Sequence, residues 1–412
     1  MARSKSSRFF NAAYILLLVS LFLIPNVPFA GFSFGIYDLL CILFVPCLLF
    51  SQKPKFQRSI TLFIFFICFS LFSLFLNVCL SGTFGITSFL RLFRLAYYPV
   101  VLLLFRGNVS IKRSSLSNIF LLLILLNSIL SLIVFAVQYD GFGITEMFIF
   151  NNQYLYRNGG IFGEANSYAV FCSFEIFLLL LLVFNFKKSL GRSLIWCLDF
   201  ALVLVNLFLT DSRTGFFSTA LCVVLFILIS RISNGKKTML LVLGLSAVFA
   251  LFLVSPKFNS YITGRIFTGQ NLTDYSSGRL YVWSSGFADW AGSGFFTLLF
   301  GKGFCLSDGA SNMYLTDNVY LNVLFSTGLI GFILFVCWIY LSYKENRSRM
   351  FRLLFLMFLF AGLFLDIITS TRLLIFLSLF LANGYQLEKP RAISPKQYMI
   401  YMRATAECTK TV

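Results

Sequence analysis

Long apolar stretches alternate with short polar segments along the whole chain. Most of these stretches approach the roughly 20 residues that an α-helix needs to cross a lipid bilayer, so we predict an all-α, polytopic membrane protein with about twelve transmembrane helices. The predicted spans are residues 10–29, 35–50, 59–80, 87–105, 117–137, 165–185, 193–210, 214–230, 238–254, 318–340, 351–367 and 371–383.

The composition supports a membrane protein and limits its chemistry. Of the 412 residues, 59% are hydrophobic and 12% are charged, which is about half the charged fraction of a soluble domain. The chain has no His, which excludes imidazole bases, His-ligated metals and Ser-His-Asp triads. Its ten Cys show no zinc-type spacing. We therefore expect neither a metal centre nor a disulfide framework.

The net charge of +18 follows a topological pattern. Most basic residues precede the first span or lie in alternate loops, which the positive-inside rule assigns to the cytoplasm. We therefore expect both termini in the cytoplasm and no nucleic-acid partner. A signal peptide is the alternative for the N-terminal segment, but its removal would invert the charge pattern. We predict one membrane domain, residues 1–384, followed by a cytoplasmic tail, residues 385–412.

Two loops on the opposite, outer side are longer than a helix connection requires. They are residues 138–166 and 255–317, and the second comes directly before the tenth span. Loops of this length are usually functional. Within the second loop, apolar residues recur at helical spacing in SSGRLYVWSSGFADW, residues 276–290. This spacing predicts an amphipathic helix on the outer membrane surface.

Four short motifs follow one another along the chain, each at an outer helix end or in the long loop. They are GIFGEANSYA at 160–169, TDSRTGF at 210–216, GRLYVW with LFGKGF at 278–283 and 299–304, and TDNVYL at 316–321. In order and location they resemble motifs of the O-antigen polymerase and ligase superfamily. Those bacterial enzymes move polyprenyl-pyrophosphate-linked glycans on the outer face of the inner membrane. The chain departs from the family pattern at Ala165, where Pro is usual.

The resemblance implies a class-C glycosyltransferase-like architecture, with residues 255–317 as a periplasmic loop, and a lipid-linked pyrophosphate substrate. Arg suits a departing pyrophosphate because it is permanently charged and binds phosphate oxygens in a bidentate fork. We therefore expect an enzyme that needs no metal or other cofactor. The motifs select Arg213 and Arg279 as catalytic residues. They also place Asn166, Asn318 and Tyr320 among the expected substrate contacts.

Further arginines are predicted to bind substrate. Arg157 and Arg372 are expected on the outer face. Arg91 and Arg94 lie within the fourth span, three residues apart and so on one helical face. An Arg at the bilayer centre costs roughly 2.5–3.5 kcal/mol on insertion scales, so such residues usually face an interior cavity. For Arg91 and Arg94, pyrophosphate binding and pairing with Asp38 are both open explanations.

Glycosyl transfer also needs a base for the proton of the acceptor hydroxyl. Without His, carboxylates are the main candidates, beside a perturbed Tyr or substrate-assisted catalysis. We select Asp317 and Glu164, because each abuts a span end within a motif. Capping of the tenth helix by Asp317 and Asn318 is the alternative. The other outer-face carboxylates are Asp140, Glu146, Asp211, Asp274, Asp289, Asp308 and Asp366.

These features predict an O-antigen polymerase (Wzy type) of the bacterial inner membrane. It transfers the growing glycan from undecaprenyl pyrophosphate to a new lipid-linked repeat unit. An O-antigen ligase, which transfers the glycan to lipid A–core, is one alternative, although ligases carry a His where this chain has Asp317. A non-catalytic polysaccharide transporter or flippase is another, but it needs polar residues through the bilayer centre. Besides the lipid bilayer, the resemblance implies a chain-length regulator and a flippase as partners.

Overall fold

The structure is a computed structural model that describes residues 2–29, 32–50, 57–81, 86–137, 145–150, 153–185, 190–229, 279–303, 317–346, 348–368, 370–383 and 387. The helices of the first half are α1 (Ala2–Leu23), α2 (Ile36–Phe44), α3 (Arg58–Ser81), α4 (Ile86–Arg94), α5 (Tyr97–Phe105), α6 (Arg113–Val137), α7 (Ala165–Asn185), α8 (Leu190–Leu209) and α9 (Arg213–Ile229), with the short 3-10 helices η1 (Pro46–Phe50) and η3 (Gly160–Phe162). The later helices are α13 (Arg279–Ala291), α14 (Phe295–Phe300), α15 (Val319–Glu345), α16 (Arg349–Ala361) and α17 (Thr371–Asn383).

Two short antiparallel hairpins complete the described part. Strands β1 (Val27–Phe29) and β2 (Phe32–Phe34) pair with Val27 opposite Phe34. Strands β3 (Thr145–Phe150) and β4 (Gln153–Asn158) pair with Thr145 opposite Asn158. The second hairpin lies within the predicted 138–166 loop and leads through η3 into α7. It therefore fixes the approach of the chain to the first motif.

The predicted all-α, polytopic architecture is confirmed. Among the described residues, six helical segments are long and apolar enough to cross a membrane when α4 and α5 are counted together, and five shorter apolar helices accompany them. They coincide in order with every predicted span except the ninth, residues 238–254, which lies outside the described residues. Most of the predicted outer loop and tail also lies outside them, so the domain boundaries stay predictions.

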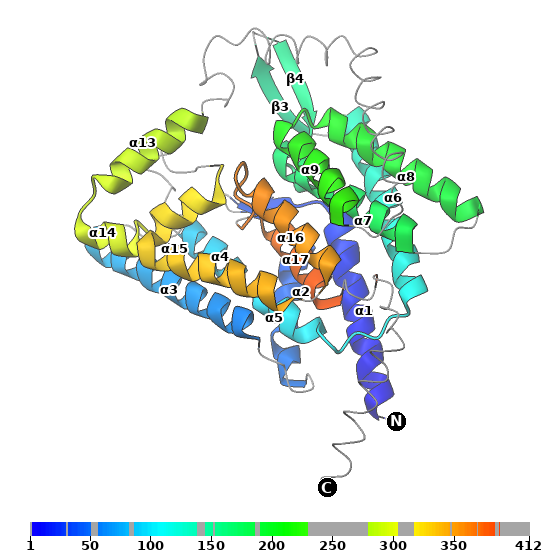
Figure 1. Cartoon of the computed structure of the whole chain (residues 1–412), viewed down its shortest axis with the longest axis horizontal. Coiled ribbons are helices and arrows are strands. Elements are labelled where there is room, and N and C mark those ends of the chain that lie inside the picture. Colours follow the sequence, from blue (N-terminus) through cyan, green and yellow to red (C-terminus); the bar gives the residue numbers. More distant parts are fainter. Residues whose placement is uncertain are drawn as a thin grey trace.

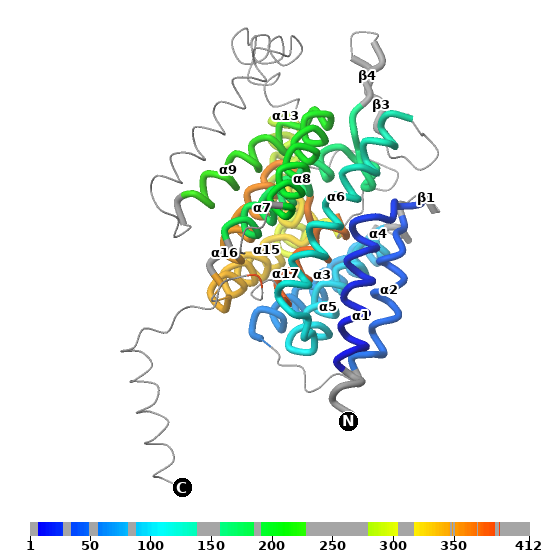
Figure 2. The backbone as a smooth tube through the Cα atoms, turned by 90° about the vertical axis from the view of Figure 1, so that its right-hand side faces the viewer, coloured from blue at the N-terminus to red at the C-terminus, as the bar shows by residue number. Residues whose placement is uncertain are grey.

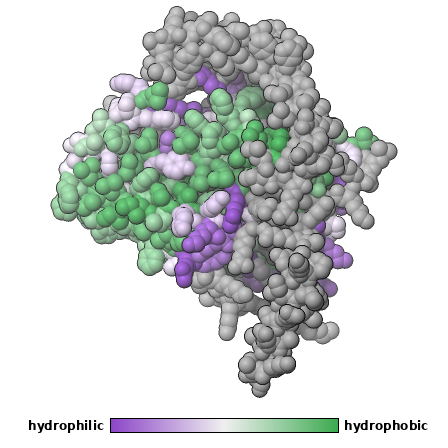
Figure 3. All heavy atoms as spheres, in the orientation of Figure 1, coloured by the Kyte–Doolittle hydropathy of each residue, from purple (hydrophilic) through white to green (hydrophobic). Residues whose placement is uncertain are grey.

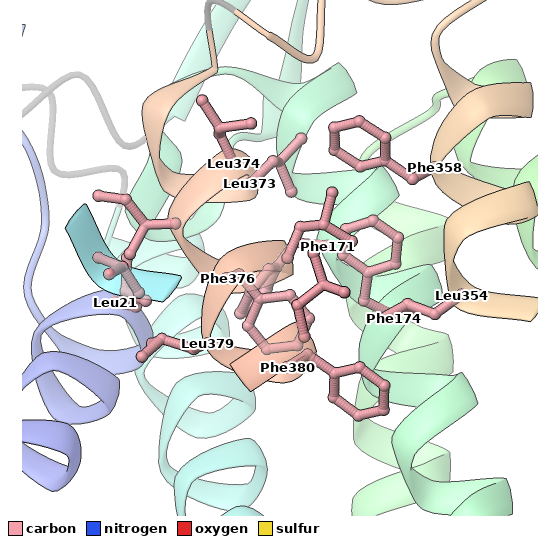
Figure 4. Close-up of a cluster of buried hydrophobic side chains, with 14 of the residues drawn as sticks. Leu21, Phe171, Phe174, Leu354, Phe358, Leu373, Leu374, Phe376, Leu379 and Phe380 are labelled. Carbon is pink, nitrogen blue, oxygen red and sulfur yellow. The ribbon is translucent and has the colours of Figure 1, made fainter. Parts of the chain in front are cut away.

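The core is built around α7 and α17, which are apolar on all sides and therefore need cover in every direction. In the most apolar 18-residue stretch of α7, 89% is buried inside the protein, and all residues of α17 are buried. Phe376 of α17 lies 5.3 Å from Phe171 and 5.5 Å from Phe174 of α7, measured between ring centroids. Figure 4 shows this contact between the two helices, with Leu21 of α1 and Phe358 of α16 beside it.

The outer helices present apolar side chains to the surroundings instead. In the most apolar stretches of α3 and α8, only 28% and 22% are buried inside the protein. Figure 3 shows a broad hydrophobic surface over α3, α14 and α15, with more hydrophilic residues beyond both of its ends. A surface of this kind fits contact with lipid rather than water, which agrees with a multi-pass membrane protein.

The two ends of the molecule differ in what they carry. Helix α1 begins at one end, whereas the β3–β4 hairpin and α13 lie at the opposite end (Figures 1 and 2). The charge pattern predicts that α1 begins in the cytoplasm, so the opposite end is the predicted outer end. The long-loop helix predicted from its apolar spacing is present as α13. Its Trp290 is buried, whereas Leu280 and Phe287 are exposed.

The fourth span consists of two helices rather than the continuous one that was predicted. Helix α4 ends at Arg94, and α5 begins at Tyr97 after a short turn. Pro99 explains the interruption: it lacks an N–H, and its ring clashes with the carbonyl four residues earlier, that of Leu95. The break leaves Arg94 at a helix end, where its side chain reaches α2.

Helix α15 is interrupted at Gly328, whose φ of 65° lies in the left-handed region. The chain after α14 packs into this interruption: Lys302 N donates to Phe325 O and Gly303 N to Ser326 O, both at 2.9 Å. A Cβ on Gly301 would lie 2.2 Å from Ser326 O, and one on Gly328 would lie 2.4 Å from the Leu299 backbone. Both positions therefore require Gly.

Candidate functional site

A polar cavity of about 190 Å³ lies where the ends of several helices meet. Its walls come from the end of α1 (Asn26), α2 (Tyr37), α4 (Arg94), the start of α7 with η3 before it, and the α16–α17 connection. The remaining lining residues are Phe162, Glu164, Ser167, Asp366, Ser370, Thr371 and Arg372. The cavity thus joins segments from both ends of the sequence. It contains three of the residues that the sequence selected, namely Arg94, Glu164 and Arg372.

Arg372, at the start of α17, is the most deeply buried cation of this cavity, with 1% of its surface exposed. Its Nη2 donates to Ile24 O at 2.7 Å and to Asn26 Oδ1 at 2.8 Å. Its guanidinium lies over the rings of Phe162, at 4.7 Å, and Tyr37, at 5.1 Å. Nε and Nη1 have no hydrogen-bond partner among the described residues. Both nitrogens are buried, so the side chain holds two donors that the described residues leave unsatisfied.

Arg94 forms a two-point ion pair with the buried Asp38 of α2. Its Nε lies 2.9 Å from Oδ1, and its Nη2 donates to Oδ2 at 3.0 Å. Asp38 Oδ2 also accepts from the backbone N of Gly35 at 2.8 Å, which satisfies the N–H of the N-cap residue of α2. Of the two explanations for Arg94, the pairing with Asp38 is the observed one. Arg91 lines no described cavity and makes no hydrogen bond or ion pair within the described part of the chain.

Two carboxylates share the cavity with these arginines. Glu164, directly before α7, is exposed, and its Oε2 accepts from Ser167 Oγ. Asp366, between α16 and α17, accepts at Oδ2 from Asn322 Nδ2 of α15. Asp366 was one of several outer-face carboxylates in the sequence, but no motif selected it. Asn322 ties it to α15, directly after the last motif.

The first two motifs are joined by a network around Arg157 and Asn166. Arg157 Nε donates to Thr210 O at 2.9 Å, and its Nη2 donates to Asn166 Oδ1 at 3.1 Å. Asn166 Oδ1 also accepts from Ser212 Oγ at 2.9 Å. Arg157 therefore fastens the β4 end of the hairpin to the turn that starts α9. Arg213 is the first residue of that helix and is half-buried.

The last two motifs are joined by an ion pair between Arg279 and Asp317. Arg279 Nε and Nη2 both donate to Asp317 Oδ2, at 3.1 and 3.0 Å. The two side chains are 21% and 52% exposed. This pair links the first residue of α13 to the residue before the α15 cap. Both partners are accessible from outside, unlike Arg372.

Asn318, not Asp317, caps α15. The Asn318 Oδ1 accepts from the backbone N of Tyr320 and of Leu321, at 3.0 and 3.1 Å. The capping role that the sequence allowed for Asp317 therefore belongs to its neighbour. Tyr320 donates its hydroxyl to Leu359 O of α16 at 2.8 Å. Asn318 and Tyr320 thus have structural partners in addition to any contact with substrate.

Seven of the predicted residues fall into three groups: the cavity, the Arg157 network and the Arg279–Asp317 pair. Arg91, Arg213, Asn318 and Tyr320 lie outside these groups. Sequence reasoning missed Asn26, Tyr37, Ser167 and Thr371 as cavity residues. Ser167 lies in the first motif but carries no charge, and the other three lie in no motif. Their only sequence signal is a polar or aromatic residue near an outer span end. Glu175, within α7, accepts from Asn127 of α6 at 2.7 Å. This hydrogen bond joins the two helices within the buried core.

The fold and this polar end define a multi-pass membrane protein with a one-sided site of arginines, carboxylates and amides. Residues 198–336 match the family model described as O-antigen ligase. This match is consistent with the O-antigen polymerase and ligase superfamily, which the motifs resemble. No curated protein matches the chain.

Proposed function

We propose that the protein is an O-antigen polymerase of the bacterial inner membrane. The family match points to polymerase or ligase activity, and glycosyl transfer is the reaction that both share. The observation that carries the proposal is the pairwise joining of the four motifs. The Arg157–Asn166–Ser212 bonds join the first two, and the Arg279–Asp317 pair joins the last two. Segments far apart in sequence are thus joined in two separate groups, one of Arg157 with amide and hydroxyl partners and one of Arg279 with Asp317.

In this proposal the donor is the growing glycan on undecaprenyl pyrophosphate, and the acceptor is a new lipid-linked repeat unit. The acceptor hydroxyl attacks the anomeric carbon of the donor, and the bond from that carbon to the pyrophosphate breaks with its electron pair. Arg213 and Arg279 neutralise the leaving pyrophosphate. Because Arg279 is partly exposed, it can exchange Asp317 for a phosphate oxygen without leaving a buried charge unpaired.

The acceptor proton goes to a carboxylate, for which Glu164 and Asp317 are the candidates. Glu164 lines the cavity, and Ser167 orients its carboxylate. Asp317 uses Oδ2 to hold Arg279, while its Oδ1 makes no hydrogen bond within the described residues. These contacts favour Glu164 as the base and Asp317 as the residue that positions Arg279. The ligase and transporter alternatives differ from this proposal in product, so the experiment measures product.

The test is a replacement of the chromosomal gene by variants at normal expression, with lipopolysaccharide separated by length. We expect a ladder of lengths from wild type, and core lipid with at most one repeat unit when the gene is deleted. Loss of all repeat units, including the first, would indicate a ligase. An unchanged ladder in the deletion strain would contradict both activities.

The predicted orientation is tested separately by cysteine accessibility. Substitutions of Ser307 or Thr273, which lie in the predicted periplasmic loop, are expected to react with a membrane-impermeant thiol reagent in cells with an intact inner membrane. Reaction only after the inner membrane is permeabilised would reverse the topology. The proposed site would then face the cytoplasm, which contradicts polymerisation on the periplasmic side.

A further inference from the structure

The cavity beside Arg372 combines cations with carboxylates instead of gathering cations alone. Its lining contains Arg94 and Arg372 together with Glu164 and Asp366, and the charge of Arg94 is already balanced by Asp38. A pyrophosphate offers only acceptor oxygens and negative charge, so the two lining carboxylates disfavour it. A sugar hydroxyl both donates and accepts, and it finds both kinds of partner here.

The neutral groups of the lining point to the same class of ligand. The hydroxyl of Thr371 makes no hydrogen bond within the described part of the chain, although the residue is 5% exposed. Arg372 Nε and Nη1 are likewise unused. Asn26 Oδ1 accepts from both Tyr37 and Arg372, which fixes the orientation of its amide. The cavity therefore offers several oriented donors beside two carboxylate acceptors.

The size of the cavity limits the ligand further. A volume of about 190 Å³ is below the roughly 300 Å³ at which pockets for drug-sized molecules begin. One sugar ring is a better match to this volume than an oligosaccharide. Tyr37 and Phe162 also line the cavity, but their rings are occupied by the Arg372 guanidinium, so the surface offered to a ligand is mainly polar.

We infer that this cavity binds the terminal sugar of the acceptor. This inference rests on the proposed glycosyl transfer. The pyrophosphate of the donor binds outside it, at Arg213 and Arg279. The acceptor sugar then presents its hydroxyl to Glu164. The hydroxyl oxygen bonds to the anomeric carbon of the donor, its proton passes to the Glu164 carboxylate, and undecaprenyl pyrophosphate leaves. Arg372 and Thr371 act as sugar-binding residues that do not touch the leaving group.

The experiment uses the purified full-length protein in lipid nanodiscs and two probes. One probe is the oligosaccharide released by mild acid from the strain's own lipid-linked repeat unit, which carries no phosphate. The other is undecaprenyl pyrophosphate without sugar. Thr371→Val removes one hydroxyl at nearly constant shape, and Arg372→Lys removes the planar fork. Thr61→Val, on α3, is the matched control. Among the described residues, the Thr61 hydroxyl bonds only to Gln57 O, directly before the same helix.

We expect Thr371→Val to weaken oligosaccharide binding about 5-fold, the worth of one hydrogen bond, and Arg372→Lys to weaken it about 10-fold or more. Binding of undecaprenyl pyrophosphate should stay unchanged, and Thr61→Val should match wild type for both probes. If Arg372→Lys does not fold, Thr371→Val carries the test alone.

Unchanged oligosaccharide binding in folded Thr371→Val would overturn the inference, as would wild type that binds undecaprenyl pyrophosphate but no oligosaccharide. Weaker binding of undecaprenyl pyrophosphate in the cavity variants would assign the cavity to the pyrophosphate instead. Wild type that binds neither probe would contradict the proposed function itself, so the two failures are distinguishable.

Discussion

Arg279 and Arg372 lie in two regions that differ in how far the guanidinium is exposed and in what it bonds to. Arg279 is partly exposed and bonds to a carboxylate that is itself half exposed. Arg372 is buried, stacks on two aromatic rings and bonds only to neutral oxygens among the described residues. An exposed pair can open toward a charged ligand and close again at low cost. A buried cation held from several sides keeps one position, which suits orientation of a neutral ligand.

The same two regions differ in their relation to the family match. Arg213, Arg279 and Asp317 lie within the matched residues 198–336, whereas every residue that lines the cavity lies outside them. On our proposal, the matched region handles the lipid pyrophosphate, and the cavity handles the acceptor. We therefore expect substitutions in the two regions to have different effects.

The largest expected effect separates the two candidate bases. Glu164→Gln keeps the shape of the side chain but cannot take a proton. We expect its turnover to fall by about 10² to 10⁴, the usual contribution of a general base. Asp317→Asn still offers Arg279 an acceptor oxygen, so it should lose less, and it should lose no helix cap because Asn318 is the cap. Product length in reconstituted membranes measures both.

An active Glu164→Gln together with an inactive Asp317→Asn would transfer the base role to Asp317. Activity in both variants would indicate a substrate-assisted route and remove the carboxylates from the mechanism. Ser167→Ala serves as a milder check, because it deletes the group that donates to Glu164.

The next effect concerns stability in the buried region. Arg94→Ala leaves Asp38 buried without its partner, which should destabilise the protein by about 3–5 kcal/mol. Arg91→Ala is the control three residues away, and we expect wild-type abundance and thermal stability from it. Asp38→Asn combined with Arg94→Gln should recover much of the loss. Equal stability of the two single Ala variants, measured in detergent, would show that the ion pair contributes little.

In the matched region, Arg213→Ala and Arg279→Ala should reduce activity without reducing abundance. Loss of a charge-assisted contact to the leaving pyrophosphate costs roughly 2–4 kcal/mol, or about 30- to 1,000-fold in rate. Arg→Lys should restore little, because a point charge cannot replace the fork. A normal length ladder from both Ala variants at normal expression would exclude these residues from the mechanism.

The smallest effect tests the cap beside Asp317. Asn318→Ala should cost about 1 kcal/mol of stability, whereas Asn318→Asp should keep the cap and match wild type. Thermal unfolding of the two variants measures the difference. If Asn318→Asp is stable but inactive, Asn318 also contacts the substrate. Equal unfolding temperatures would show that the cap has no measurable energetic role.

The sequence predicts the membrane helices well because burial in lipid demands long apolar stretches, and each stretch is visible locally. The α13 helix was predictable from a different local signal, the helical spacing of its apolar residues. Pro99 marks the break between α4 and α5, but it is permitted within a membrane span, so the pattern of apolar residues did not reveal the break. The interruption at Gly328 depends on the Gly301–Gly303 backbone, a contact that no local pattern records.

The candidate site was predicted only where charge or motif marked it. Arg213, Arg279, Glu164 and Asp317 were selected from motifs, and Asp38 was named as the alternative partner of Arg94. The cavity itself was not predictable, because Arg372 bonds to Asn26, 346 positions away in the sequence. Neutral residues such as Thr371 gain a role only through that packing.

Reconstitution tests the central claim most directly. Purified protein in liposomes receives the lipid-linked repeat unit of its own strain as the sole glycan, and glycan length and free undecaprenyl pyrophosphate are measured together. The account predicts lipid-linked oligomers, with one undecaprenyl pyrophosphate released for each new glycosidic bond. Movement of the repeat unit across the bilayer without bond formation, or transfer only when lipid A–core is added, would contradict it.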